Sequence, residues 1–134
     1  MILTLVDVAT HLATLGVVER DNIYCGKMED KKEKSIGVYY LKRSQQKRET
    51  IGGDVNSSYR IKQVSFLVHW DKSTERTEQA ANDLYEAVKG IKKVTVNGKN
   101  ILFTKMLTDE PVGVGTDDNG IYEMVVEAEI YYER

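Results

Sequence analysis

The sequence contains almost none of the residues that cross-link or stiffen a chain. Cys25 is the only cysteine and Pro111 the only proline among 134 residues, so the chain can form no internal disulfide and no thiolate metal cluster of its own. His11 and His69 are the only side chains that titrate as ordinary bases near neutral pH. These shortages exclude a disulfide-stabilised scaffold and leave little material for acid–base catalysis.

Long hydrophobic runs are also missing. The most apolar stretch, MILTLVDVATHLATLGVV, is interrupted by Asp7 and His11 and lacks a basic leader, so we expect neither a signal peptide nor a membrane span. The apolar fraction is 41%, the charged fraction 30% and the formal net charge −2. These values are typical of a soluble domain and predict neither a membrane nor sequence-specific nucleic acid as a partner. The length predicts a single domain over residues 1–134.

Two segments have helical patterns. In the first, Thr4 is placed to cap a short amphipathic helix that ends near Gly16. In the second, Ser73 or Thr74 can cap a helix that Gly90 closes, with an apolar stripe at spacings of three and four. The stripe consists of Ala80, Ala81, Leu84, Tyr85 and Val88. This second segment is the clearest helix in the chain.

Several other segments have β character. We expect strands at residues 22–26 and 36–41, and a further strand where Val64, Phe66, Val68 and Trp70 alternate with Ser65 and His69. Tyr59 and Ile61 precede that strand in the opposite phase, which predicts a β-bulge near Lys62 and Gln63. Residues 42–58 hold almost no large apolar side chain, so we expect a long flexible loop there that orders on a partner.

The C-terminal third predicts antiparallel strands. Asn97 and Gly98 suit a type I′ turn that would place Val94 opposite Ile101. After a loop at residues 111–120, every even residue from Tyr122 to Tyr132 is apolar, while glutamates occupy most odd positions. That alternation predicts one long strand with a buried face and an exposed acidic face. The fold class is therefore α+β, with a mostly antiparallel β-sheet and two main α-helices.

No catalytic, cofactor-binding or metal site is predicted. His11 and His69 lack a convincing constellation of partners, so we assign each a structural or solvated role. Cys25 has no nearby histidine motif and reads as an inert, partly buried thiol. The acidic residues between Asp109 and Glu123 do not have EF-hand spacing, and the GVGTDDNG segment lacks the lysine and glycine spacing of a phosphate loop.

The most informative signal is a charge asymmetry that the net charge hides. Lys42, Arg43, Lys47 and Arg48 form a basic run. The charged residues in the segment from Asp109 to Glu133 are all acidic. Opposite charges on separate elements favour head-to-tail association, which closes into a ring when the rotation permits. The alternative, that both are simply solvated faces, stays open. The candidate subunit or partner interface consists of Lys42, Arg43, Lys47, Arg48, Asp117, Asp118 and Glu123.

The segments SFLVHWDKSTERTEQAANDLYEAV and PVGVGTDDNGIYEMVVEAEIYYER resemble minor capsid or tail-terminator-type proteins of long-tailed phages and prophages. The most specific piece is the GTD-x-x-GIYE stretch at Gly115 to Glu123. The resemblance implies an α+β subunit that assembles as a ring, typically a hexamer, on the end of the tail tube. It also implies contacts with the tail tube protein and the head–tail connector, in the virion neck and, during assembly, in the host bacterial cytoplasm.

Two other classes of function remain open from the sequence. One is a different neck component, such as a head-completion or connector protein, for which docking on the portal side would be diagnostic. The other is a small metal-dependent hydrolase, against which the shortage of histidines argues. The tail terminator is the preferred interpretation, and it needs no enzymatic activity and no cofactor.

Overall fold

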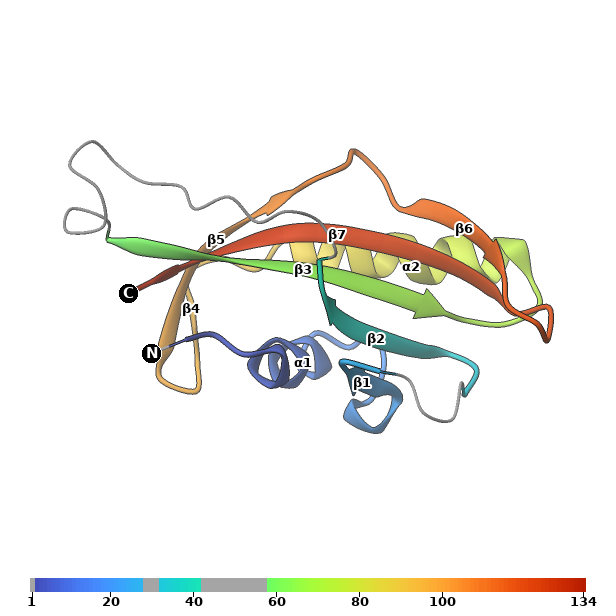
Figure 1. Cartoon of the computed structure of the whole chain (residues 1–134), viewed down its shortest axis with the longest axis horizontal. Coiled ribbons are helices and arrows are strands. Elements are labelled where there is room, and N and C mark those ends of the chain that lie inside the picture. The colour runs from blue at the N-terminus through green and yellow to red at the C-terminus, as the bar shows by residue number, and fades with distance from the viewer. Residues whose placement is uncertain (1, 28–31, 42–57) are drawn as a thin grey trace.

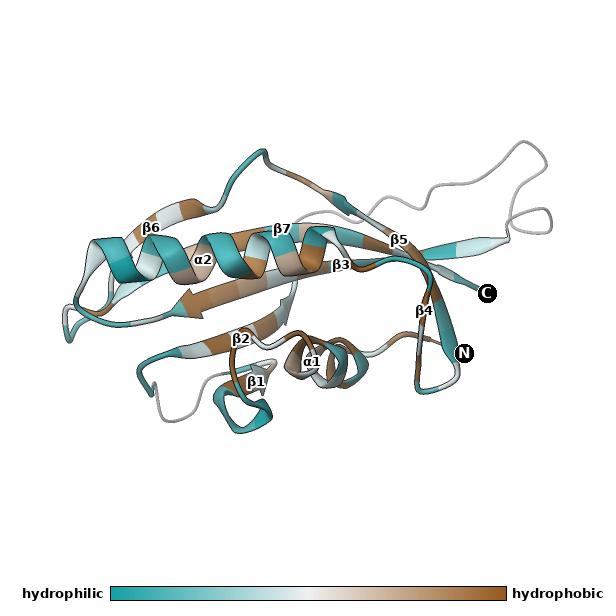
Figure 2. Cartoon of the chain, turned by 180° about the vertical axis from the view of Figure 1, so that it is seen from behind, coloured by the Kyte–Doolittle hydropathy of each residue, from teal (hydrophilic) through white to brown (hydrophobic). Residues whose placement is uncertain are grey.

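The structure, a computed structural model, describes residues 2–27, 32–41 and 58–134. One curved sheet carries both main helices on the same face, α2 along one half and α1 along the other (Figures 1 and 2). The strand order is β1-β2-β3-β7-β5-β4, and β6 pairs with β7 beside β5. All described pairings are antiparallel except that of β1 with β2. The predicted α+β class is confirmed.

The helices and strands of the described residues have the following bounds. The helices are α1 (Leu5–Ala13), the short 3₁₀ helix η1 (Arg20–Asn22) and α2 (Thr74–Lys89). The strands are β1 (Ile23–Cys25), β2 (Ser35–Tyr40), β3 (Tyr59–His69), β4 (Val94–Val96), β5 (Lys99–Met106), β6 (Val112–Thr116) and β7 (Tyr122–Glu133). None of the helices in these ranges is long and apolar enough to cross a membrane.

The long strands β3 and β7 form the centre of the sheet. Their register runs without interruption from Tyr59 opposite Glu133 to His69 opposite Glu123, so the bulge predicted near Lys62 and Gln63 is wrong. Even-numbered residues of both strands share one face, and those from Val64 to Val68 and from Val126 to Tyr132 are buried beneath the helices. Tyr59 is out of phase with Val64, Phe66 and Val68 for another reason. Its side chain lies on the opposite, helix-free face of the sheet, where its ring is 5.5 Å from that of Tyr131.

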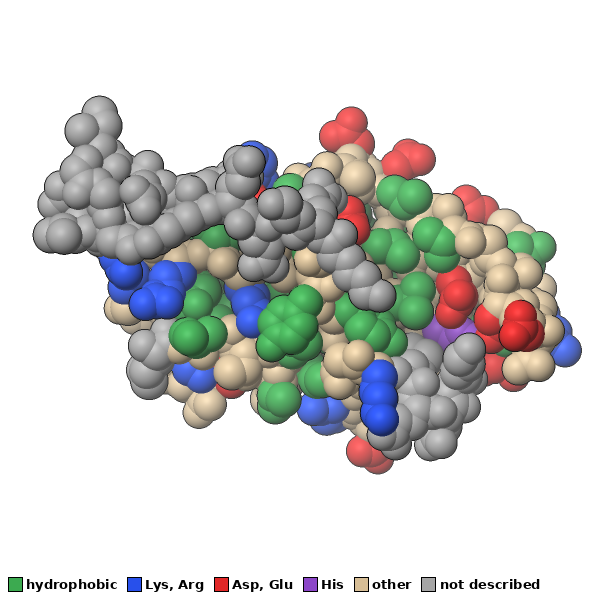
Figure 3. Space-filling view, viewed as in Figure 1, with side chains coloured by type: hydrophobic (Ala, Val, Ile, Leu, Met, Phe, Trp, Pro, Cys, Tyr) green, Lys and Arg blue, Asp and Glu red, His purple; other side chains and the backbone are tan. Residues whose placement is uncertain are grey.

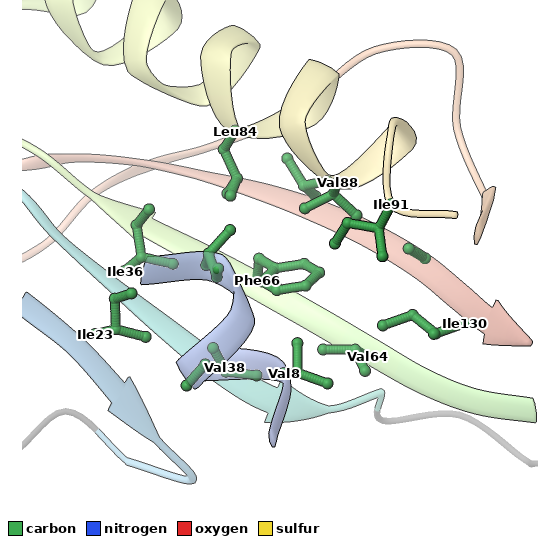
Figure 4. Packing of buried hydrophobic residues seen from close by; sticks show 14 of the residues in the cluster. Val8, Ile23, Ile36, Val38, Val64, Phe66, Leu84, Val88, Ile91 and Ile130 are labelled. Carbon is green, nitrogen blue, oxygen red and sulfur yellow. The ribbon is translucent and has the colours of Figure 1, made fainter. Parts of the chain in front are cut away.

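The core lies between the even-numbered face of the sheet and the two helices. Phe66 is fully buried at its centre, below Leu84 and Val88 of α2, while Val8 of α1 covers the neighbouring part of β2 and β3 (Figure 4). Each fully buried side chain of this kind stabilises the fold by roughly 1.5–3 kcal/mol. The predicted apolar stripe of α2 is therefore confirmed as the core-facing side of the helix.

Local capping fixes where the helices begin. Thr4 and Asp7 form a capping box at the start of α1, in which each side chain accepts a hydrogen bond from the backbone N–H of the other residue. Ser73 accepts a hydrogen bond from the backbone N–H of Arg76 at the start of α2. Both predicted caps are thus confirmed.

The β4–β5 hairpin is clamped onto α1 by the same Asp7. Lys99 Nζ lies 2.6 Å from Asp7 Oδ2, and Asn97 donates a hydrogen bond of 3.2 Å to Oδ1. Burial alone would raise the pKa of Asp7, but the hydrogen bonds from Lys99, Thr4 and Asn97 together lower it to about 2. The predicted register is confirmed, with Val94 opposite Ile101 around a turn in which Asn97 and Gly98 have positive φ.

Two expectations for the C-terminal third need correction. Residues 112–116 of the segment predicted as a loop form the strand β6, because their backbone pairs with Val125 to Tyr122 at the start of β7. The odd-numbered face of β7 is not uniformly exposed either, since Glu129 is only 1% exposed. Its carboxylate accepts hydrogen bonds from Gln63 at 2.9 Å and from the Tyr131 hydroxyl at 3.4 Å.

Candidate interaction surface

The exposed end of the sheet, where β6 meets β7 and the N-terminal half of α2, holds the described members of the predicted interface. Acidic side chains gather toward this end of the molecule, whereas lysines and arginines are more frequent toward the end that carries the C-terminus (Figure 3). We call the region formed by β6, the turn at residues 117–121 and the first two turns of α2 the acidic end.

The turn between β6 and β7 is built around Asp117. Its Oδ1 accepts hydrogen bonds from the backbone N–H groups of Asn119 at 2.8 Å and Ile121 at 3.0 Å. Gly120 has a φ of +79°, a conformation that few other residues adopt without strain. The aspartate side chain therefore shapes the turn from within, as is usual for this residue type.

His69 joins this turn to the central strands. Its Nδ1 lies 2.8 Å from Glu123 Oε2 and its Nε2 lies 3.7 Å from Asp117 Oδ2. The imidazole is only 1% exposed, so its role is structural and not solvated. Burial, together with the charge of Glu123, also raises the pKa of Tyr39 on β2.

The sequence did not reveal this acid–histidine–acid arrangement. His69 and Glu123 are 54 positions apart, and only the pairing of β3 with β7 places them opposite each other. The sequence showed a histidine at the end of an alternating strand. Nothing in the neighbouring sequence indicated which acidic residues it contacts. Within the described ranges no cluster of three or more His, Cys, Asp or Glu side chains is arranged to hold a metal ion.

The predicted interface residues differ in their contacts and exposure. Asp117 and Glu123 are engaged within the fold, whereas Asp118 between them is exposed. The four basic members, Lys42, Arg43, Lys47 and Arg48, lie outside the described residues, as does most of the loop predicted at 42–58. The structure thus brings the acidic half of the predicted interface together at one end of the sheet.

The other candidate chemical groups are ordinary parts of the fold. His11 is partly exposed on α1, and burial lowers its pKa. Cys25 is partly buried on β1, with its sulfur 3.7 Å from the carbonyl oxygen of Leu5. The structural or solvated role of His11 and the inert character of Cys25 stay predictions.

Strand β6 is the most exposed regular element at the acidic end. All five of its residues are exposed, including Val112 at 46% and Val114 at 53%. A groove of about 400 Å³ separates β6 from α2, and its lining includes Thr77, Glu78, Glu110 and Met124. Gly113 and Gly115 also line the groove, where open space surrounds the position of a Cβ atom.

Comparison with known proteins bears on the identity of the chain. A family model described as "Bacteriophage tail terminator protein" matches residues 11–134, which include both central strands, α2 and the whole acidic end. No curated protein matches the chain in sequence. The chain therefore belongs to the bacteriophage tail terminator family, whose members are structural components of the virion tail and contact other virion proteins.

Proposed function

We propose that this protein caps the phage tail tube as an oligomeric ring and provides the surface on which the head connector docks. The observation that carries the proposal is the family match over residues 11–134, nearly the whole chain. The exposed acidic end supports it, because a subunit of an assembly needs surface that its own fold does not use. Neither role requires catalysis or a cofactor.

In the proposed mechanism, the ring resembles a ring of tube protein on one face and differs from it on the other. One face of the ring presents the docking surface that a further ring of tube protein would present, so it binds the open end of the tube. The other face lacks the features that bind tube protein, so addition stops there and the connector binds instead. Interfaces of this kind achieve specificity through complementary charge and shape, while buried apolar contacts supply most of the affinity.

Opposite charges on neighbouring subunits would set the register of the ring. On the acidic side Asp118 is the exposed member, while Asp117 and Glu123 maintain the turn that presents it. We retain Lys42, Arg43, Lys47 and Arg48 as the proposed basic side. Partly exposed pairs contribute about 0–1 kcal/mol each and are screened by salt, so the ring should loosen as ionic strength rises.

A tube-polymerisation assay tests the capping role directly. Purified tube protein of the same phage is polymerised with and without this protein, and tube lengths are measured by electron microscopy. We expect tubes that stop growing and carry extra density at one end. Unchanged growth, or binding to purified connector without any binding to tubes, would contradict capping and favour a connector-type role.

A matched pair of variants ties the effect to the acidic end. Asp118→Lys should weaken capping, whereas Asp83→Lys, an equal charge change on an exposed position of α2, should leave it intact. Light scattering across protein concentration, at low and high salt, would measure ring mass in parallel. A monomer at every condition would mean that any ring forms only on the tube.

A further inference from the structure

Strand β6 has the properties of a pairing site that its own chain leaves open. It pairs with β7 on one side, and no described strand pairs with its other side. An exposed edge presents unpaired N–H and C=O groups, and proteins usually protect such edges with charged residues or proline inside the strand. The five residues of β6, VGVGT, include neither, although the strand is short and its register with β7 shifts between Gly113 and Gly115. The outer side of β6 therefore has no charged side chain or proline within the strand that would oppose a further strand.

The charges around β6 restrict what that strand can be. Glu78 of α2 lies across the groove, Asp109 and Glu110 precede the strand, and Asp118 follows it, all of them exposed. A strand that carries further acids would be repelled, while one flanked by lysine or arginine would be attracted. The partner strand should therefore be short, uncharged within the pairing region and basic at its flank.

Strand β4 of the same sequence meets this description. It is the outermost strand on its side of the sheet, with residues VTV, and Lys92 and Lys93 immediately precede it. Both lysines are exposed, as is Lys89 at the end of α2. Lys93 also adopts a positive φ of 51°, in the turn that leads into the strand.

At the far end of the described strand order, the edge strand β1 is a poorer match than β4. The carbonyl oxygen of Ile23 in β1 already accepts a hydrogen bond of 2.8 Å from the Arg20 guanidinium. The residues before the strand are of mixed charge, with Glu19, Arg20 and Asp21 in succession. Charge therefore favours β4 over β1 as the strand that meets β6.

We propose that β4 of one copy pairs edge to edge with β6 of a second copy, with Lys92 and Lys93 facing Asp109 and Glu110. The contact joins two different surfaces of the same chain, so it can link successive copies and close into a ring. The pairing rests on the proposed ring-forming function and specifies the strands that would join its subunits. Backbone hydrogen bonds and the exposed valines of β6 supply the contact, and the charges select its register.

Two exposed side chains report on this contact. Thr95 of β4 points away from the core, because its neighbours Val94 and Val96 belong to the core cluster. Val112 of β6 lies opposite Val125, on the same helix-free face. If β4 and β6 are adjacent strands of neighbouring copies, these two positions come within reach of a short cross-linker.

A mixing experiment with single-cysteine proteins tests the proposal. Thr95→Cys and Val112→Cys are prepared separately in a Cys25→Ser background and treated with a short bismaleimide, alone and as an equimolar mixture. We expect a cross-linked dimer in the mixture and little in either protein alone. Equal cross-linking of one protein with itself, or no cross-linking under conditions where light scattering shows an oligomer, would overturn the β4–β6 pairing.

Charge reversal gives a second readout. Lys92→Glu and Glu110→Lys should each raise the dissociation constant of self-association about threefold to tenfold, as expected for the loss of one or two partly exposed ion pairs. Mixing the two variants should restore association, because each reversed strand then meets its reversed partner. Lys32→Glu, an exposed reversal ahead of β2, is the control and should have no effect.

The outcome is separable from that of the proposed function. A ring that forms but neither cross-links at these positions nor responds to Lys92→Glu would reject this pairing and leave termination standing. A protein that stays monomeric at every concentration would reject the pairing as a contact of the free chain. In both cases the tube-polymerisation assay still decides independently whether the protein caps the tube.

Discussion

At its C-terminal end β7 lies between β3 and β5, with the β4–β5 hairpin clamped to α1 through a buried aspartate. At its N-terminal end the same strand lies between β3 and β6, whose residues are all exposed. Both ends contain an acid that accepts several hydrogen bonds, the buried Asp7 at one and the partly buried Asp117 at the other. One end thus joins elements into the core, and the other holds an exposed strand in place.

The two ends of β7 differ in what they contribute, folding stability at one end and exposed surface for assembly at the other. The end near Asp7 contributes to the stability of the isolated chain, because it ties the first helix to a distant hairpin. At the acidic end, all five residues of β6 are exposed, so substitutions in that strand can alter contacts with other molecules without disturbing the core. Substitutions at the two ends should therefore separate stability from assembly.

The largest effect should come from the shared core beneath both ends. Phe66→Ala removes the largest fully buried side chain and leaves a cavity between β3 and α2, so we expect a loss of about 3–5 kcal/mol in the free energy of unfolding. Urea or guanidinium denaturation followed by circular dichroism would measure it. Phe66→Leu, which keeps most of the volume, should cost considerably less. A loss below 1 kcal/mol would contradict the packing described.

The next effect concerns the clamp at Asp7 and depends on pH. The folded pKa of Asp7 is about 2, below its ordinary value of 3.8, so the carboxylate contributes stability that is fully present above about pH 4. That contribution, on the order of 2 kcal/mol, should be lost as pH falls from about 4 to 2.

The matched variant for the clamp is Asp7→Asn. It should be less stable than the wild type at pH 6, and the difference should shrink toward pH 2 as the wild-type carboxylate is protonated. Unfolding free energies measured across this range provide the test. A difference that stays constant with pH would mean that the Asp7–Lys99 pair does not contribute as its geometry indicates.

A smaller and more local effect is expected at the other end of β7. Asp117→Ala removes the acceptor of two backbone N–H groups in the turn, one of them exposed, and should cost about 1 kcal/mol. Hydrogen exchange should rise in β6 and the following turn while the core strands stay protected. Asn at this position keeps an acceptor oxygen and should restore most of the protection. Uniformly faster exchange would show that the two ends are not independent.

The smallest effect on folding should come from β6 itself. Val114 is 53% exposed, so Val114→Thr should change the free energy of unfolding by no more than about 0.5 kcal/mol. The same substitution should still weaken self-association, because it removes apolar contact from the proposed pairing edge. Thermal unfolding and light scattering on the same samples measure both quantities. A stability loss above 1 kcal/mol would show that β6 belongs to the core.

Elements that depend on local chemistry were predictable. The caps at Thr4 and Ser73, the stripe on α2 and the Asn97–Gly98 hairpin all follow from residues a few positions apart. The false bulge near Lys62 arose where a second cluster, Tyr59 with Phe103 and Tyr131, occupies the helix-free face. The odd-numbered apolar residues Tyr59 and Ile61 were interpreted as a shift of register. The sequence alone does not show that apolar side chains pack on both faces of the strand at that point.

Charge singled out Asp117, Asp118 and Glu123 as candidate interface residues, which stays a prediction, but it did not indicate their contacts within the fold. Asp118 is exposed as expected, whereas Asp117 and Glu123 hold His69 and the turn. Strand β6 was missed because it contains two glycines and follows the only proline, features that usually mark a loop. Its strand conformation depends on the backbone of β7, which lies next to it only in the folded chain.

The sequence by itself determined the fold class, the positions of both main helices, the final strand and the concentration of acids near the C-terminus. These features follow from periodicity and composition, which act over a few neighbouring residues. Tertiary structure alone decided that β7 pairs with β3, β5 and β6, that His69 and Glu129 are buried, and that β6 and β4 each have an outer side with which no described strand pairs. Each of these depends on contacts between residues far apart in the chain, whose selection requires the packing of the whole sheet.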